Sequence, residues 1–235
     1  MKLLVAGCSV SDRGNLDYCY GDVLSEKLGY EYIHEGSGCG SNFRIWRVVT
    51  NMIMNKEITP EDKVVIQYTS THRQEFWTSH PIDEKDYIGE NQLVHPYKDF
   101  GHLIKFKMNS HSWQTHKKNK EFFKLYQDGH VNKAYDNEVF AVNHFNFANT
   151  LIAYNINAVF LNVFTYLHPN LIVLPQGLDA VNISVEQLRP EHIQQKDPIP
   201  SHFTDEGHTY VANCLYDYFK KNERKINIIL RRPFK

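Results

Sequence analysis

LLVAGCSVSD, residues 3–12, is a short apolar run that ends abruptly in small and polar side chains. Its apolar half predicts a buried strand over residues 2–7, and the break after Gly7 places Ser9 in the turn beyond that strand. In an open α/β sheet, ligands bind in the crevice outside the carboxyl ends of the strands. Ser9 is therefore either a cap for the next helix or a nucleophile, and this stretch alone favours the cap.

The alternation of strand and helix patterns continues over the first 70 residues. Apolar side chains at helical spacing predict helices over residues 17–28 and from Ser41 or Asn42 onward. Short apolar runs at residues 30–33 and 63–68 predict two more strands. This order is typical of βαβ units, so we predict a flavodoxin-like α/β fold with three layers, α/β/α, around a central parallel sheet.

The pattern is interrupted between residues 71 and 137. This segment is polar, weakly periodic and rich in His, Lys and aromatic residues, and it is too long for a plain loop. We interpret it as an insertion over the carboxyl edge of the sheet, with a helical portion at residues 121–127. It is either a lid or substrate-binding wall, or a decoration or interface. The whole chain, residues 1–235, is accordingly predicted to be one domain that carries this insertion.

The regular pattern returns beyond the insertion. Residues 139–156 predict a long helix, and residues 158–163 predict a fourth strand. Residues 165–200 are rich in proline and are predicted to be loops, and the last helix is predicted to begin after Thr204.

Composition and charge argue against several classes of protein. With 26 basic and 27 acidic side chains there is no net attraction to nucleic acid or to a membrane, so we expect neither as a partner. The four cysteines form no CxxC pair, which argues against a zinc knuckle and for reduced thiols. We find no signal-peptide pattern and no apolar run of about 18 residues, and we therefore expect a cytoplasmic protein.

Motifs for cofactors and metals are weak. The glycine turn at residues 36–40 lacks the GxGxxG spacing of a dinucleotide site, and we expect no cofactor. His72, His80, His95 and His102 lack the close spacing of metal ligands, so a histidine metal site is an alternative that we do not favour.

Four segments, taken in order, resemble the sequence blocks of the SGNH (GDSL) hydrolase family. They are Gly7-Cys8-Ser9-Val10-Ser11, Gly38-Cys39-Gly40-Ser41-Asn42, Gln67-Tyr68-Thr69-Ser70 and His202-Phe203-Thr204-Asp205-Glu206-Gly207-His208. The last segment matches the family's order of a His, a Ser or Thr, and a Gly before a helix. The resemblance covers most of the chain outside residues 71–137 and implies a serine hydrolase.

The resemblance implies roles for individual residues. Ser9 corresponds to the nucleophile, and His202 corresponds to the general base that takes and returns the serine proton. The backbone N–H groups of Ser9 and Gly38 correspond to oxyanion donors, because a glycine lets the backbone approach the reacting carbonyl closely. Gly40 is the alternative donor if the alignment shifts by two residues.

The histidine block leaves two questions open. His208 follows an Asp at the family's Asp-x-x-His spacing and is an alternative base. Gly207 stands where the family has its helix-opening glycine, which favours His202. The family's orienting Asp would fall on Ile199, and Asp197 is the nearest carboxylate. Without that carboxylate, the serine and the histidine would act as a dyad.

Two further departures concern the neighbours of the nucleophile. Cys8 replaces the Asp of the first block with a small side chain that still packs. Thr69 and Ser70 stand in place of the family's oxyanion Asn, and a hydroxyl is a less fixed hydrogen-bond donor. Some relatives have Thr-Ser followed by Arg at this place, and Arg73 fits that variant.

These residues together predict a serine esterase that cleaves a small acyl ester, such as an O-acetyl group on a carbohydrate. Trp77, Tyr97 and Trp113 lie in the insertion and are candidates for stacking on sugar rings, although core packing explains them equally well. The alternative is a catalytically weak or inactive binding or structural module on the hydrolase fold, which the missing Asn and the displaced Asp would explain.

Overall fold

A five-stranded parallel sheet forms the centre of the molecule. The computed structural model describes residues 1–11, 18–36, 40–71, 73–78, 94–97, 101–107, 133–163, 172–183, 187–194 and 202–229. The strand order is β2–β1–β3–β7–β8, with β1 at Lys2–Gly7, β2 at Glu31–Gly36, β3 at Lys63–Gln67, β7 at Asn157–Val163 and β8 at Asp179–Ile183. All neighbours are parallel. The predicted flavodoxin-like α/β fold is confirmed.

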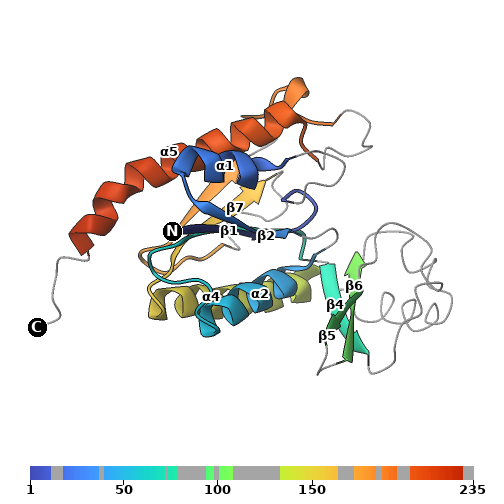
Figure 1. The fold of residues 1–235 in the computed structure, drawn as a ribbon. Helices are drawn as coiled ribbons and strands as arrows, with labels where there is room; N and C mark the ends of the chain where they lie inside the picture. Colours follow the sequence, from blue (N-terminus) through green and yellow to red (C-terminus); the bar gives the residue numbers. More distant parts are fainter. Residues whose placement is uncertain are drawn as a thin grey trace, which may run out of the picture.

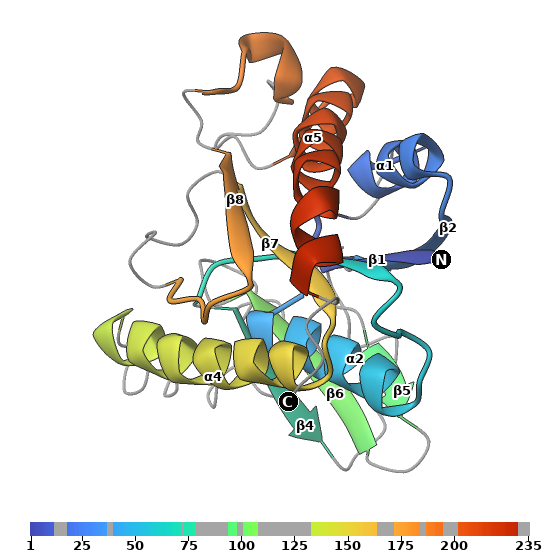
Figure 2. The ribbon, with the colours of Figure 1, turned by 90° about the vertical axis from the view of Figure 1, so that its left-hand side faces the viewer.

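Helices cover both faces of this sheet (Figure 1). One face carries α1 and α5, and the other carries α2 and α4. Their bounds are Tyr20–Leu28 for α1, Asn42–Met54 for α2, Lys133–Ala153 for α4 and Asp205–Ile229 for α5. Figure 2 shows the same layers from the side, with the sheet between α5 and α4.

The central strands are mostly apolar because both of their faces are buried. Leu4 and Ala6 of β1 pack in the core cluster beneath α2 and α4. Leu3 and Val5 pack in the other cluster, beneath α1 and α5. All four side chains are fully buried. The continuous run that opens the chain is therefore the sequence of a strand at the centre of the sheet.

Helix ends follow the residues that the sequence offers. Gly29 ends α1 in the left-handed conformation, with φ of 69°, as the sequence predicts. Ser41 is the N-cap of α2, and its Oγ accepts the N–H of Arg44 at 3.1 Å. None of the helices in the described ranges has the length and apolar character that a membrane span needs.

One strand of the central sheet was not predicted. β8 lies within residues 165–200, which the sequence predicts to be loops. It is a five-residue strand at the edge of the sheet, and most of its side chains are exposed or half-buried. An edge strand of this kind needs no apolar run, so the segment has none of the signal that identifies β1 and β3.

A second, antiparallel sheet lies within the segment predicted to be an insertion. Its strand order is β4–β6–β5, with β4 at Arg73–Thr78, β5 at Val94–Tyr97 and β6 at Gly101–Lys107. β4 begins shortly after β3 ends, and it packs against α2 (Figure 2). The helix predicted at residues 121–127 lies outside the described residues. One domain with an insertion at residues 71–137 stays a prediction.

Candidate active site

Three turns begin side by side at the carboxyl edge of the sheet. Gly7, at the end of β1, pairs in register with Gly36, at the end of β2. On the other side of β1, Ala6 pairs with Ile66 of β3. The turns that follow these strands contain the candidate residues Ser9, Gly38, Thr69 and Ser70. The register therefore brings the ends of the three strands that precede these residues to one edge of the sheet.

The turn that carries Ser9 is fixed from beneath by Gln67. The Oε1 atom of Gln67 accepts hydrogen bonds from Ser11 Oγ at 2.8 Å, from the Cys8 N–H at 3.3 Å and from Cys8 Sγ at 3.3 Å. Ser11 Oγ also lies 2.7 Å from Tyr20 OH. All four side chains are fully buried, so these bonds form away from water.

Ser9 itself is half-buried and caps none of the helices in the described ranges. The N-cap of α1 is Cys19, whose N–H donates to Asp22 Oδ2 at 2.8 Å. The capping role that the first stretch of sequence favours for Ser9 is therefore wrong. The reason is that residues 8–11 form a turn of their own, closed by a bond from the Ser11 N–H to the Cys8 carbonyl at 2.9 Å.

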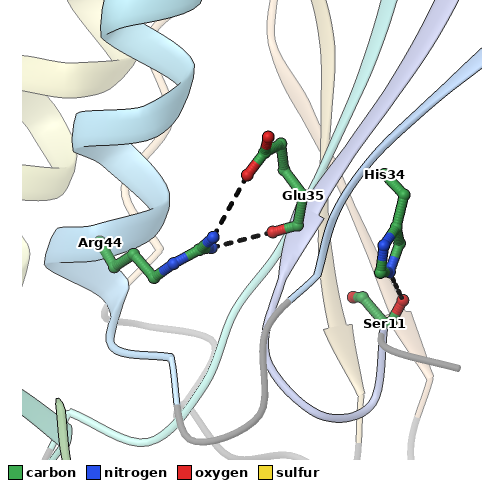
Figure 3. A network of polar contacts seen from close by, with 4 residues as sticks. All are labelled: Ser11, His34, Glu35 and Arg44. Carbon is green, nitrogen blue, oxygen red and sulfur yellow. Dashed lines mark hydrogen bonds and ion pairs between the residues drawn. The ribbon is translucent and has the colours of Figure 1, made fainter. Parts of the chain in front are cut away.

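Polar contacts join this turn to β2 and α2 (Figure 3). His34 Nε2 donates to the Ser11 carbonyl at 3.1 Å. On the opposite side of β2, Arg44 Nη1 donates to the Glu35 carbonyl at 2.9 Å, and Arg44 Nη2 lies 3.2 Å from Glu35 Oε2. Gly38 lies between these anchored segments, outside the described residues, and the alternative donor Gly40 is buried.

The turn after β3 is tied to the start of α2. The Thr69 N–H donates to Asn42 Oδ1 at 3.0 Å, and Asn42 Nδ2 donates to the Thr69 carbonyl at 2.9 Å. Thr69 Oγ1 is buried and has no hydrogen-bond partner in the described part of the chain. Ser70 is half-buried. Arg73 is the first residue of β4, and its side chain is not among those described.

Backbone hydrogen bonds between residues 192–194 and 202–204, called the strap below, hold the backbone on either side of His202. Ile193 and Phe203 form an antiparallel bridge, and the Gln194 N–H donates to the His202 carbonyl at 3.1 Å. The Phe203 side chain is fully buried, whereas His202 is half-buried. The strap and the buried ring thus fix the backbone on either side of a partly accessible imidazole.

The glycine of this block is required by close packing. A Cβ at Gly207 would lie 2.1 Å from the His192 carbonyl oxygen. The Gly207 N–H donates to Thr204 Oγ1 at 3.2 Å, so Thr204 caps α5. The family-like order of His, Thr and Gly is therefore explained locally by a capped helix that starts against the strap.

His208 is a structural link between α5 and α1. Its side chain is 3% exposed, and its Nδ1 accepts the Tyr20 N–H at 3.2 Å. The imidazole ring of His208 stacks with the Tyr20 ring and contacts the Phe203 ring edge-on. Burial lowers the pKa of His208 to about 4. Its role as an alternative base would require this buried contact to open, whereas His202 is already accessible.

A cavity of about 340 Å³ lies beside the His202 loop. Its lining includes Tyr18, His192 and the first turns of α5, where Asp205 and Tyr210 face it. The His192 and Tyr210 rings stack with centroids 4.9 Å apart. Aromatic rings beside carboxylates are a combination that suits polar ligands with an apolar face, such as sugars.

Several predicted site residues cannot be placed. Asp197, Gly38 and Trp113 lie outside the described residues, as do His72 and His80. Trp77, His95, Tyr97 and His102 lie on described strands, but their side chains do not belong to the described part. The pairing of Ser9 with His202 therefore stays a prediction.

Residues that sequence reasoning missed form the supports of the site. Asn42 and Gln67 stand inside the quoted motifs, yet only the pairing across strands reveals what their amides bind. His34 and Arg44 carry no local motif. Their signal is a polar residue at the buried end of a strand or helix, where it must find a partner.

Comparisons with known proteins agree with this fold. No protein-family model matches the chain, and no curated protein does. Acetyl xylan esterase AlAXEase is similar with a TM-score of 0.51 and 13% identity, over 93% of this chain and 99% of that chain. Esterase EstA from Pseudoalteromonas sp., inhibited by monoethylphosphonate, has a TM-score of 0.51 and 11% identity, over 94% and 97%. A lipolytic protein of the G-D-S-L family from Desulfitobacterium hafniense has a TM-score of 0.46 and 9% identity, over 92% and 98%. The first two show that this chain has the fold of an esterase.

Proposed function

We propose that the protein is a serine hydrolase of the SGNH type that cleaves an acyl ester through an acyl-enzyme. The observation that carries this proposal is the register of the sheet edge. It sets the end of β1, which precedes Ser9, beside the ends of β2 and β3, which precede Gly38 and Ser70 in the sequence. His202 precedes α5 in the order that the SGNH resemblance requires. The esterase fold of the chain supports the same class of chemistry.

In the proposed reaction, Ser9 Oγ attacks the ester carbonyl carbon while His202 takes the hydroxyl proton. The carbonyl oxygen becomes an oxyanion that accepts hydrogen bonds from the N–H of Ser9, from Gly38 or Gly40, and from Ser70. The intermediate then expels the alcohol, which receives the proton from His202. The product of this half-reaction is an acyl group on Ser9.

Hydrolysis repeats the same steps with water as the nucleophile. His202 takes a proton from water, the hydroxide attacks the acyl carbon, and Ser9 leaves with the proton that His202 returns. Asp197 is the proposed partner that orients the imidazole. A carbohydrate O-acetyl ester is the proposed substrate class, because one structural neighbour is an acetyl xylan esterase. The aromatic and acidic lining of the cavity beside the His202 loop suits a sugar.

The test compares hydrolysis of p-nitrophenyl acetate and acetylated xylan by the native protein and by Ser9→Ala. We expect kcat/KM to fall by at least about 10³ in Ser9→Ala, because the nucleophile is lost. Ser25→Ala is the matched control, since Ser25 Oγ only donates to the Asp22 carbonyl within α1. We expect that variant to stay within about twofold.

A fluorophosphonate probe adds a second readout, because it reports an activated serine without requiring the right ester. Labelling of the native protein at Ser9, and its loss in Ser9→Ala, would support the proposal. An unlabelled native protein that binds acetylated xylan without cleaving it would favour the binding module instead.

A further inference from the structure

Both polar atoms of the Asn42 side-chain amide form hydrogen bonds with the backbone of one residue, Thr69. Its Nδ2 donates to the Thr69 carbonyl at 2.9 Å, and its Oδ1 accepts the Thr69 N–H at 3.0 Å. The side chain is 3% exposed. A two-point contact of this kind fixes orientation as well as distance, because neither bond can rotate without lengthening the other.

The helix that begins at Asn42 does not need this side chain. The N-cap position is filled by Ser41, whose Oγ accepts the Arg44 N–H. Asn is a poor helix former in comparison with Ala or Glu. A residue chosen for α2 alone would therefore be different, and the amide is explained only by its contact across to Thr69.

This contact completes a ring of contacts, which runs from the turn of Ser9 through β2 and α2 to the turn after β3. Gln67, two residues before Thr69, holds the turn of Ser9 and Ser11. The Ser11 carbonyl is held by His34, and Glu35 beside it holds Arg44 of α2 (Figure 3). Asn42 completes the ring by returning from α2 to the turn after β3.

The glycine segment of residues 37–39 lies outside the described residues, and anchored residues flank it in the sequence. Glu35 and Gly36 precede it on β2, and Asn42 follows it at the start of α2. On the far side of the Asn42 contact, Ser70 follows Thr69 directly. The single amide of Asn42 thus connects the start of α2, two residues after the alternative donor Gly40, to the segment that carries Ser70.

From this connection we infer that Asn42 is a positioning residue, which sets the spacing between the alternative oxyanion donor Gly40, next to the start of α2, and the donor Ser70. The inference rests on the proposed function and deepens it. Asn42 does not touch the ester. It acts through the backbone of Thr69, and its effect is realised when the carbonyl oxygen becomes an oxyanion.

The experiment measures kcat and KM separately for Asn42→Ala and Asn42→Asp on p-nitrophenyl acetate. The Asp side chain has the shape of Asn but cannot donate to the Thr69 carbonyl. We expect kcat to fall by about 10- to 100-fold in both variants, with KM within about threefold, because donor misplacement weakens transition-state binding most. The rate of fluorophosphonate labelling at Ser9 should fall in parallel.

Asp62→Ala is the matched control. Asp62 is buried to a similar degree and also clamps backbone, accepting the Lys2 N–H at 2.7 Å and the Thr59 N–H at 3.0 Å. It does so at the amino ends of β1 and β3, the opposite edge of the sheet. We expect this variant to lose thermal stability while kcat stays within about twofold.

Three outcomes would overturn the inference, and they are distinguishable. A native protein without Ser9-dependent turnover or labelling would overturn the proposed function and this inference with it. A native protein with Ser9-dependent turnover, whose Asn42 variants fold and keep kcat within twofold, would overturn the inference alone. Equal losses of kcat in the Asn42 and Asp62 variants would also overturn it, because they would indicate a general loss of stability.

Discussion

The turns around Ser9 and the loop around His202 are held by different kinds of contact. The first region depends on side chains that bind backbone or one another across strands, as Gln67 and Asn42 do. The second depends on backbone-to-backbone bonds between residues 192–194 and 202–204, and on tight packing at Gly207. Side-chain clamps can be removed one at a time, whereas a packed backbone strap shifts as a unit. We therefore expect mutations in the first region to change rates and mutations in the second to change stability.

Gly207→Ala should cause the largest loss of stability among the three variants considered next. The added Cβ would lie 2.1 Å from the His192 carbonyl oxygen, and a backbone atom cannot move aside without shifting the strap. We expect the free energy of unfolding to fall by about 2–3 kcal/mol, as for other overpacked sites. Chemical denaturation measures this change. Asn213→Ala, at an exposed position of the same helix, should stay within about 0.5 kcal/mol. A Gly207→Ala protein as stable as the native one would show that the strap can shift without cost. It would contradict the expectation that mutations in the second region change stability.

Acid should weaken the second region through His208. Burial lowers its pKa to about 4, so between pH 6.5 and 4 the unfolded chain binds a proton that the folded chain does not. Folding stability therefore falls as the pH falls through this window. His208→Gln should reduce the loss between pH 7 and pH 5 by about 2 kcal/mol, since each pH unit contributes about 1.4 kcal/mol.

Denaturant unfolding at both pH values provides the measurement. His144→Gln is the comparison, because burial also lowers the pKa of His144 to about 4, on the other face of the sheet. Both variants should flatten the pH dependence by similar amounts. An unchanged pH dependence in His208→Gln would show that this ring is protonated without opening the contact to α1.

Thr69→Val should have the smallest effect. Thr69 Oγ1 is buried without a hydrogen-bond partner in the described structure, and its N–H is taken by Asn42 whatever the side chain. We expect kcat within about twofold of the native value, and stability unchanged or raised by up to about 1 kcal/mol, because an unpaired hydroxyl is removed. Steady-state kinetics and thermal unfolding are the readouts. A tenfold drop in kcat would instead identify the Thr69 hydroxyl as an oxyanion donor.

The sequence predicts the centre of this fold well for a physical reason. β1 and β3 are covered on both faces, so each contains an unbroken run of apolar residues that the sequence shows directly. Gly29 and Ser41 indicate helix ends because their own conformation or side chain suits those positions. β8 was missed because an edge strand can remain half exposed and needs no such run. Short sequence patterns therefore predict the buried strands and the helix ends, but not an edge strand.

The same distinction between local patterns and contacts across the sheet applies to the candidate site. Ser9 and His202 can be singled out because their blocks resemble a family, and the structure places Ser9 in a turn at the carboxyl edge and His202 in the loop before α5. The contacts of Asn42, Gln67 and His34 could not be predicted, because each joins segments that become neighbours only when the sheet forms. His208 illustrates the remaining ambiguity, since spacing alone does not distinguish an accessible imidazole from one buried against Tyr20.

The bond between His208 and Tyr20 has a consequence for biosynthesis. β1, α1, β2, α2 and β3 all belong to the first 67 residues, and their contacts can form while later parts are still being translated. α5 is added only after β7 and β8, and it brings His202 with it. N-terminal segments emerge first during synthesis, so the turn of Ser9 is available before the loop of His202. Docking of α5 onto α1 would then be the step that adds the His202 loop to the sheet, and in the proposed hydrolase it would complete the active site.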